Sequence, residues 1–83
     1  MRLMTKDIVA PPGGVMTDEV GTVTGDLTLA PEVAPDGTIT LKVQYKDADE
    51  WYQVTDATVQ VSDPANQQEV EQAANDLLNR FSG

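Results

Sequence analysis

Residues 37–61 constrain the fold more than any other part of the chain. Across residues 38–46, apolar and polar residues alternate strictly, which puts the apolar set on one face of a β-strand. A second stretch rich in β-branched and aromatic residues follows the acidic segment 47–50, and such residues suit a pleated strand. We therefore predict a β-hairpin with one buried face, one solvated face and an acidic tip.

The second arm of this hairpin changes its apolar phase. Its apolar residues occupy even positions first and odd positions afterwards: Tyr52 and Val54, then Ala57, Val59 and Val61. Because a one-residue slip moves every side chain to the other face, two interpretations remain open. In the first, a bulge near residues 55–56 resets the phase and turns Trp51 outward. In the second, the strand is regular, and Trp51 faces inward opposite Tyr45. We favour the bulge, because the regular strand draws Gln53 towards the core, where an unpaired amide costs about 1–3 kcal/mol.

The last part of the chain carries a helical pattern. Its apolar residues form one stripe at helical spacing: Val70, Ala73, Ala74, Leu77, Leu78 and Phe81. We predict a helix over residues 64–81, with Asp63 as its N-cap and Gly83 following its last turn. A helix so rich in asparagine and glutamine is marginal alone, so we expect its stripe to pack on the sheet.

The segments before the hairpin give weaker signals. Residues 20–29 predict a strand, in which Gly21 and Gly25 indicate a bulge or a close backbone approach. Residues 30–35 contain two prolines, which cannot donate to a sheet, and predict a stiff loop. Residues 1–18 contain a Pro-Pro-Gly-Gly break and predict a loosely ordered N-terminal arm.

These elements predict a single α+β domain over residues 19–83, with the order β-β-β-α. We expect a small three-stranded antiparallel sheet with one C-terminal helix packed on one face. The sheet has a fourth strand if residues 8–9 add an edge. The predicted core comprises Val23, Leu27, Leu29, Ile39, Leu41, Val43, Tyr45, Val59, Val61, Val70, Leu77, Leu78 and Phe81.

Composition excludes several classes of function. Fourteen acidic residues against five basic ones give a net charge of −9, which argues against direct binding of nucleic acids or anionic membranes. The chain has no cysteine and no histidine, so it lacks thiolate chemistry and the commonest general base and metal ligand. We therefore expect a non-enzymatic protein with no catalytic residue, cofactor or metal ion. With no apolar run suited to a signal peptide or a membrane span, we expect a cytoplasmic protein.

The acidic tip resembles the opening of a calcium-binding loop, reading Asp47-Ala48-Asp49-Glu50. Such a loop takes glycine at its sixth position and glutamate at its twelfth. Tyr52 and Thr58 occupy these positions here. We therefore interpret the segment as a solvated acidic turn.

The same tip is the candidate partner-binding site. It combines two aromatic residues with a ring of acids: Asp47, Asp49, Glu50, Trp51, Tyr52 and Asp56. An exposed aromatic side chain with a charged rim is typical of a binding hot spot. We predict a protein-binding module of inhibitor or adaptor type, whose partner is a protein with a basic surface. Two alternatives stay open: an acidic mimic that blocks the basic site of a DNA- or RNA-binding protein, and a structural or oligomer-forming subunit that uses the sheet edges. We expect the protein to be a monomer or weak homodimer.

Overall fold

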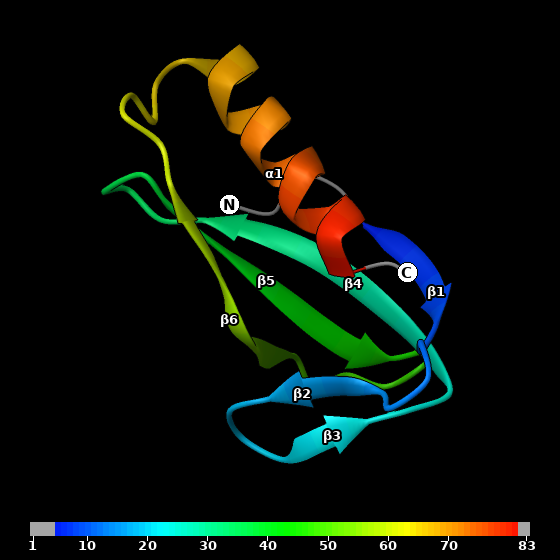
Figure 1. Ribbon diagram of the computed structural model, residues 1–83. Coiled ribbons are helices and arrows are strands. Elements are labelled where there is room, and N and C mark those ends of the chain that lie inside the picture. The colour runs from blue at the N-terminus through cyan, green and yellow to red at the C-terminus, as the bar shows by residue number, and fades with distance from the viewer. Residues whose placement is uncertain (1–4, 82–83) are drawn as a thin grey trace.

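The computed structural model describes residues 5–81, which form one antiparallel sheet covered on one face by a helix (Figure 1). Its elements are β1 (Lys6–Val9), β2 (Val15–Thr17), β3 (Gly21–Val23), β4 (Asp26–Val33), β5 (Thr38–Tyr45), β6 (Tyr52–Gln60) and α1 (Gln67–Phe81). The α+β class is confirmed. The prediction of a three-stranded or four-stranded sheet is wrong, because six strands pair within the described residues, in the order β1-β4-β5-β6-β2-β3.

The additional strands come mainly from the N-terminal segment. The structure places residues 6–9 and 15–17, which belong to the predicted loose arm, in β1 and β2. β1 pairs with β4, and β2 pairs with β3. These strands are only three or four residues long, too short for an alternating pattern to stand out in the sequence. Residues 1–4 of the predicted arm lie outside the described residues.

β1 and β2 are two halves of one bent strand, and β4 and β3 are the two halves of its partner. Residues 10–14 connect the first pair, and residues 24–25 connect the second. Across the bend, the amide of Ala10 donates a hydrogen bond of 2.9 Å to the carbonyl oxygen of Gly25.

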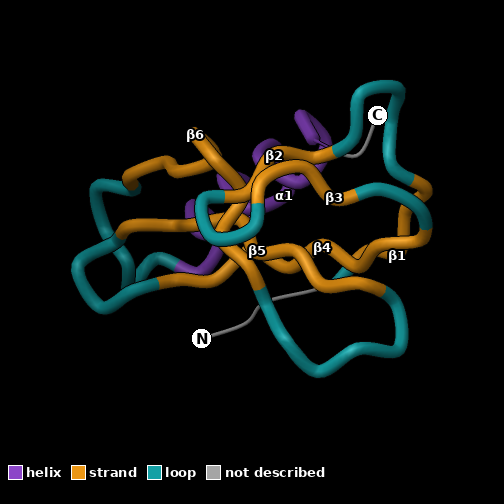
Figure 2. Tube along the Cα trace, turned by 90° about the horizontal axis from the view of Figure 1, so that it is seen from below, coloured by secondary structure: helices purple, strands orange, loops and turns teal. Residues whose placement is uncertain are grey.

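This bend brings β2 to the far side of the sheet, where Thr17 pairs with Val54 of β6. The β2–β3 hairpin therefore lies across the end of the sheet and is nearest the viewer in Figure 2. The two outer strand pairs of the sheet, β1–β4 and β2–β3, thus belong to one continuous hairpin. The sheet is curled as a result.

The central hairpin and its bulge are both confirmed. β5 pairs with β6, and the register shifts between Thr40 and Lys42 of β5. The β6 segment opposite this shift is centred on Asp56, whose φ of +59° lies in the left-handed region. Val54 before the bulge and Ala57 after it are both buried, which explains the phase change in the sequence.

The predicted stiff loop over residues 30–35 is wrong for residues 30–33, because β4 continues through Pro31 to Val33. The amide of Ala34 donates to the carbonyl oxygen of Thr38, so even-numbered residues of β4 bond to β5. The nitrogen of Pro31 therefore faces the opposite edge. Within the described residues, β1 pairs with β4 only as far as Leu29, so Pro31 removes no hydrogen bond from the described part of the sheet.

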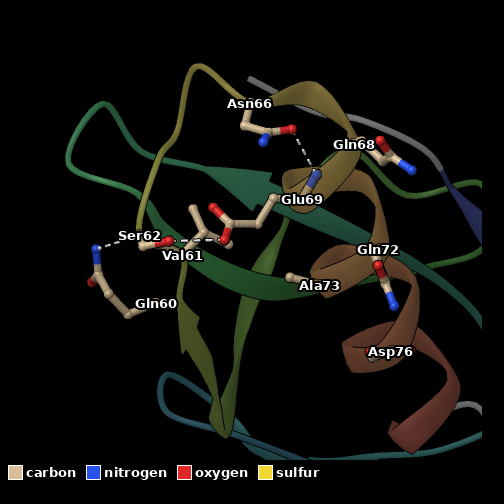
Figure 3. Close-up of a pocket in the computed structure, with 9 residues that line it drawn as sticks. All are labelled: Gln60, Val61, Ser62, Asn66, Gln68, Glu69, Gln72, Ala73 and Asp76. Atoms are coloured by element: carbon tan, nitrogen blue, oxygen red, sulfur yellow. Dashed lines mark hydrogen bonds between the residues drawn. The ribbon is translucent and has the colours of Figure 1, made fainter.

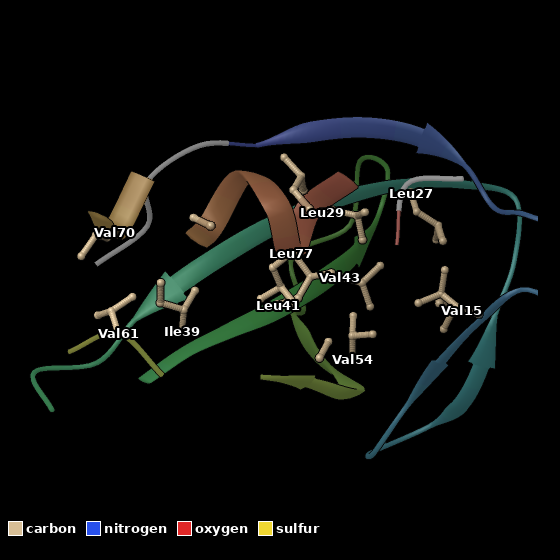
Figure 4. Packing of buried hydrophobic residues seen from close by; sticks show 14 residues of the cluster. Val15, Leu27, Leu29, Ile39, Leu41, Val43, Val54, Val61, Val70 and Leu77 are labelled. Atoms are coloured by element: carbon tan, nitrogen blue, oxygen red, sulfur yellow. The ribbon is translucent and has the colours of Figure 1, made fainter. Parts of the chain in front are cut away.

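The helix packs its predicted apolar stripe against β4, β5 and β6 (Figures 1 and 4). All of the predicted core except Tyr45 is buried or packs on the buried cluster, and Val15 and Val54 join it. Tyr45 is 41% exposed, because it is the last residue of β5 and borders the solvated tip. Across the described part of the chain, no helix combines the length and apolar character that crossing a bilayer requires.

The helix begins three residues later than predicted, at Gln67. Asn66, and not Asp63, is the N-cap, because its side-chain oxygen accepts the amide of Glu69 at 3.1 Å. Asp63 instead accepts the amide of Ala65 within the preceding turn. Gly83, predicted to follow the last turn, lies outside the described residues.

The carboxylate of Glu69 closes the loop before the helix. One oxygen accepts the amide of Asp63 at 2.9 Å, and the other accepts the hydroxyl of Ser62 at 2.8 Å. These hydrogen bonds lower the pKa of Glu69 below its ordinary value of 4.5. A lowered pKa adds stability that is present above the unfolded-state pKa and is lost as the pH falls through the folded-state pKa.

We therefore expect the stability advantage of the native chain over Glu69→Gln to shrink as the pH falls from about 5 to about 3. Urea unfolding at pH 7, 5, 4 and 3 measures this difference. Glu71→Gln removes a carboxylate from the same helix and controls for net charge. A difference between the native chain and Glu69→Gln that does not change with pH would contradict the expectation.

Candidate functional site

The tip between β5 and β6 is a tight acidic turn. The amide of Ala48 donates to the carbonyl oxygen of Tyr45 at 3.0 Å, and Asp47 adopts a φ of +68°. Aspartate accepts this left-handed conformation more readily than most residues with a side chain. Asp47, Asp49 and Glu50 are all exposed, so their carboxylates are available to a partner.

The two predicted aromatic residues follow this turn and have different surroundings. Both are partly buried, but Tyr52 packs on the hydrophobic core, whereas Trp51 lies outside that cluster. This is the arrangement expected for the bulged strand. Burial and the neighbouring charge of Glu50 raise the pKa of Tyr52 above its ordinary value. The phenol is neutral at neutral pH, as an ordinary tyrosine is, and it donates a hydrogen bond of 3.5 Å to the carboxylate of Glu50.

Two acids that sequence reasoning missed reach this site from the turn between β2 and β3. Both oxygens of the Glu19 carboxylate accept the amide of Gln53, at 2.9 and 3.1 Å. Asp18 accepts the hydroxyl of Thr55 at 2.6 Å, and its own amide donates to the carbonyl oxygen of Gln53 at 3.0 Å. Glu19 and Gln53 are 34 positions apart in the chain, so no local sequence pattern connects them.

Thr17 holds the β2–β3 turn in place. Its side chain is buried, and its hydroxyl donates to the carbonyl oxygen of Gly21 at 2.7 Å. The same hydroxyl accepts the amide of Val20 at 3.2 Å. Because a buried hydroxyl with both kinds of partner disfavours other conformations, the turn presents Asp18 and Glu19 in a fixed position.

Asp56 is the predicted site residue that lies farthest from the tip along β6. It is exposed at the centre of the β6 bulge, beyond the part of β6 that the β2–β3 turn covers. Of the predicted site residues, Asp47, Asp49, Glu50, Trp51 and Tyr52 thus lie at the tip and Asp56 at the bulge, and the fold adds Asp18, Glu19 and Tyr45.

The chemistry of this site is that of a binding surface. Carboxylates accept hydrogen bonds from lysine and arginine, and the faces of tryptophan and tyrosine attract the same cations. Among residues 5–81, no three acidic side chains are grouped closely enough to hold a metal ion.

No family model matches this chain, and comparison with curated proteins and with solved structures also gives no match. The function is therefore inferred from the geometry of the site.

Proposed function

We propose that this protein is a non-enzymatic binding module, of inhibitor or adaptor type, that engages a partner protein through the β5–β6 tip. The observation that carries the proposal is the position of Trp51, partly exposed, outside the core and directly before Tyr52 and Gln53, which donate hydrogen bonds to carboxylates from two separate hairpins. Glu50 comes from the tip itself, and Glu19 comes from the docked β2–β3 turn. The proposed compartment is the cytoplasm, because a chain without cysteine uses no disulfide.

The partner surface that fits this site is basic and rich in arginine. A guanidinium group stacks on an aromatic face and binds carboxylates through its fork of donors, so Trp51 and Glu50 together match it better than they match lysine. The Glu19 carboxylate is held by the amide of Gln53, so little conformational entropy is lost there on binding.

We expect Trp51→Ala to reduce capture of the partner at least tenfold in a pull-down from host lysate. The indole supplies the largest contact area of the tip, and residues of this kind dominate binding energies. Asn75→Ala is the control, because Asn75 is exposed on α1 and belongs neither to the tip nor to the β2–β3 turn. Capture that is equal for the two variants would contradict the proposal.

Salt and charge variants distinguish the acidic-mimic alternative. Binding through an aromatic anchor with a few charge pairs weakens less between low and physiological salt than binding by a mimic held through distributed charge. Neutralising Asp47, Asp49 and Glu50 together should abolish capture by a mimic, while Trp51→Ala should spare it. Concentration-dependent sedimentation tests the structural-subunit alternative, which requires association of copies.

A further inference from the structure

The C-terminal half of β6 leaves one edge of the sheet open. β6 pairs with β5 along one side, but with β2 only at Val54, before the bulge. The amide of Val61 donates to the carbonyl oxygen of Gly37, so odd-numbered residues of this half bond to β5. The backbone N–H and C=O groups of Thr58 and Gln60 therefore point outward. Within residues 5–81, no strand pairs with them.

A groove of about 620 Å³ begins where this edge meets α1 (Figure 3). Gln68, Gln72 and Asp76 recur at four-residue spacing and form one row along the helix. Val61 and Ala73 supply apolar surface between the strand and this row. The groove thus has a backbone edge on one side and polar side chains on the other, as recognition of an extended peptide requires.

The charges around the groove indicate what can occupy it. Its lining contains the carboxylates of Glu69 and Asp76 and no lysine or arginine. Asp56, exposed in the bulge, adds a third carboxylate at the beginning of the same edge. A second copy of this chain, with a net charge of −9, would place acids against acids, and this repulsion disfavours a homodimer here.

We infer that the β6–α1 groove accepts an extended basic segment of a partner protein, which adds to the sheet as a further strand beside β6. Its backbone bonds to Thr58 and Gln60. Its side chains alternate, so that every second one, lysine or arginine, faces Gln72 and Asp76 of the helix. The bulge separates this surface from the tip, so the inference stands independently of the tip proposal.

In the test, the full chain is mixed with a synthetic hexapeptide of alternating lysine and valine, and amide hydrogen exchange of the chain is measured. We expect the outward amides of Thr58 and Gln60 to exchange at least tenfold more slowly when the peptide is bound. The amide of Ala48 at the tip should not change. A hexapeptide of alternating glutamate and valine should give no protection. Absence of protection at millimolar lysine–valine peptide, or protection by the acidic peptide, would overturn the inference.

Thr58→Pro gives a sharper form of the same test. Proline removes only an N–H that points away from β5, so no hydrogen bond of the sheet is lost, but strand addition is blocked. We expect protection of Gln60 by the peptide to disappear in Thr58→Pro and to persist in the matched control Thr58→Ala. Protection retained in Thr58→Pro would contradict strand addition.

A helix variant leaves the strand backbone intact. Asp76→Lys should weaken peptide binding at least tenfold, because it places a cation in the row that faces the peptide. Glu71→Lys makes the same change of charge on an exposed part of α1 that does not line the groove. Equal weakening by both variants would show that net charge, and not the groove, governs binding, and would overturn the inference.

Discussion

Replacing Leu77 with alanine should lower the free energy of unfolding by about 2–4 kcal/mol. Leu77 is fully buried, and it points from α1 into the cluster that contains Leu29, Leu41 and Val43 (Figure 4). Truncation removes the transfer free energy of the side chain and leaves a cavity, because the surrounding strands relax only in part. Small domains have a total stability of about 5–15 kcal/mol, so the loss is a large fraction of the whole.

Urea unfolding of the native chain and of Leu77→Ala measures this effect. Asn75→Ala is the matched control on the exposed face of the same helix. It should leave stability unchanged or raise it by about 0.5 kcal/mol, because alanine has the higher helix propensity. A loss below about 1 kcal/mol for Leu77→Ala would mean that the helix does not pack on the sheet as described.

The second large effect is expected at Gly14, where the strand that contains β1 and β2 bends. Gly14 has a φ of +77°, and a side chain in this left-handed region costs about 1–2 kcal/mol. A Cβ atom there would also lie 2.8 Å from the carbonyl oxygen of Val23 and against the methyl group of Thr22. Val23 pairs with Val15, so its carbonyl cannot move away without disturbing the β2–β3 hairpin. We expect Gly14→Ala to destabilise the protein by about 2–4 kcal/mol.

Gly13 provides the control for this prediction. Its φ of +89° imposes a similar backbone strain, but a Cβ atom there meets nothing within 4 Å. Gly13→Ala should therefore cost only about 1–2 kcal/mol in the same urea experiment. The difference in the free energy of unfolding between the two variants measures the cost of the close contacts at Gly14. Equal losses of stability would contradict a cost from those contacts.

The long elements of this fold were predictable because they carry enough residues to show a period. β5, the bulge of β6 and the apolar stripe of α1 all follow from residue spacing. β2 and β3 have three residues each, and their pairing is set by the bend at Gly14 and by the contact with β6. The prediction of a loop at Pro31 was wrong for another reason. Proline is excluded from a β-strand only where its nitrogen faces a paired neighbouring strand.

The candidate site was predictable only in its local part. The acidic turn and Trp51 with Tyr52 are adjacent in the sequence, so their proximity needs no knowledge of the fold. Asp18 and Glu19 arrive through a tertiary contact, which a reading of neighbouring residues cannot detect. The N-cap illustrates the same limit at short range, because Asp63 and Asn66 are both suitable caps and the loop geometry decides between them.

The curled sheet has a consequence for the order of assembly. The hairpins β4–β5 and β5–β6 join segments that are neighbours along the chain, whereas the contact of Thr17 with Val54 closes a much longer loop. Closing a longer loop costs more conformational entropy, and regions with few buried contacts open more readily in the native state. We therefore expect Asp18 and Glu19 to reach β6 after the two local hairpins have formed, so that a partner that requires these acids binds only once β2 has paired with β6.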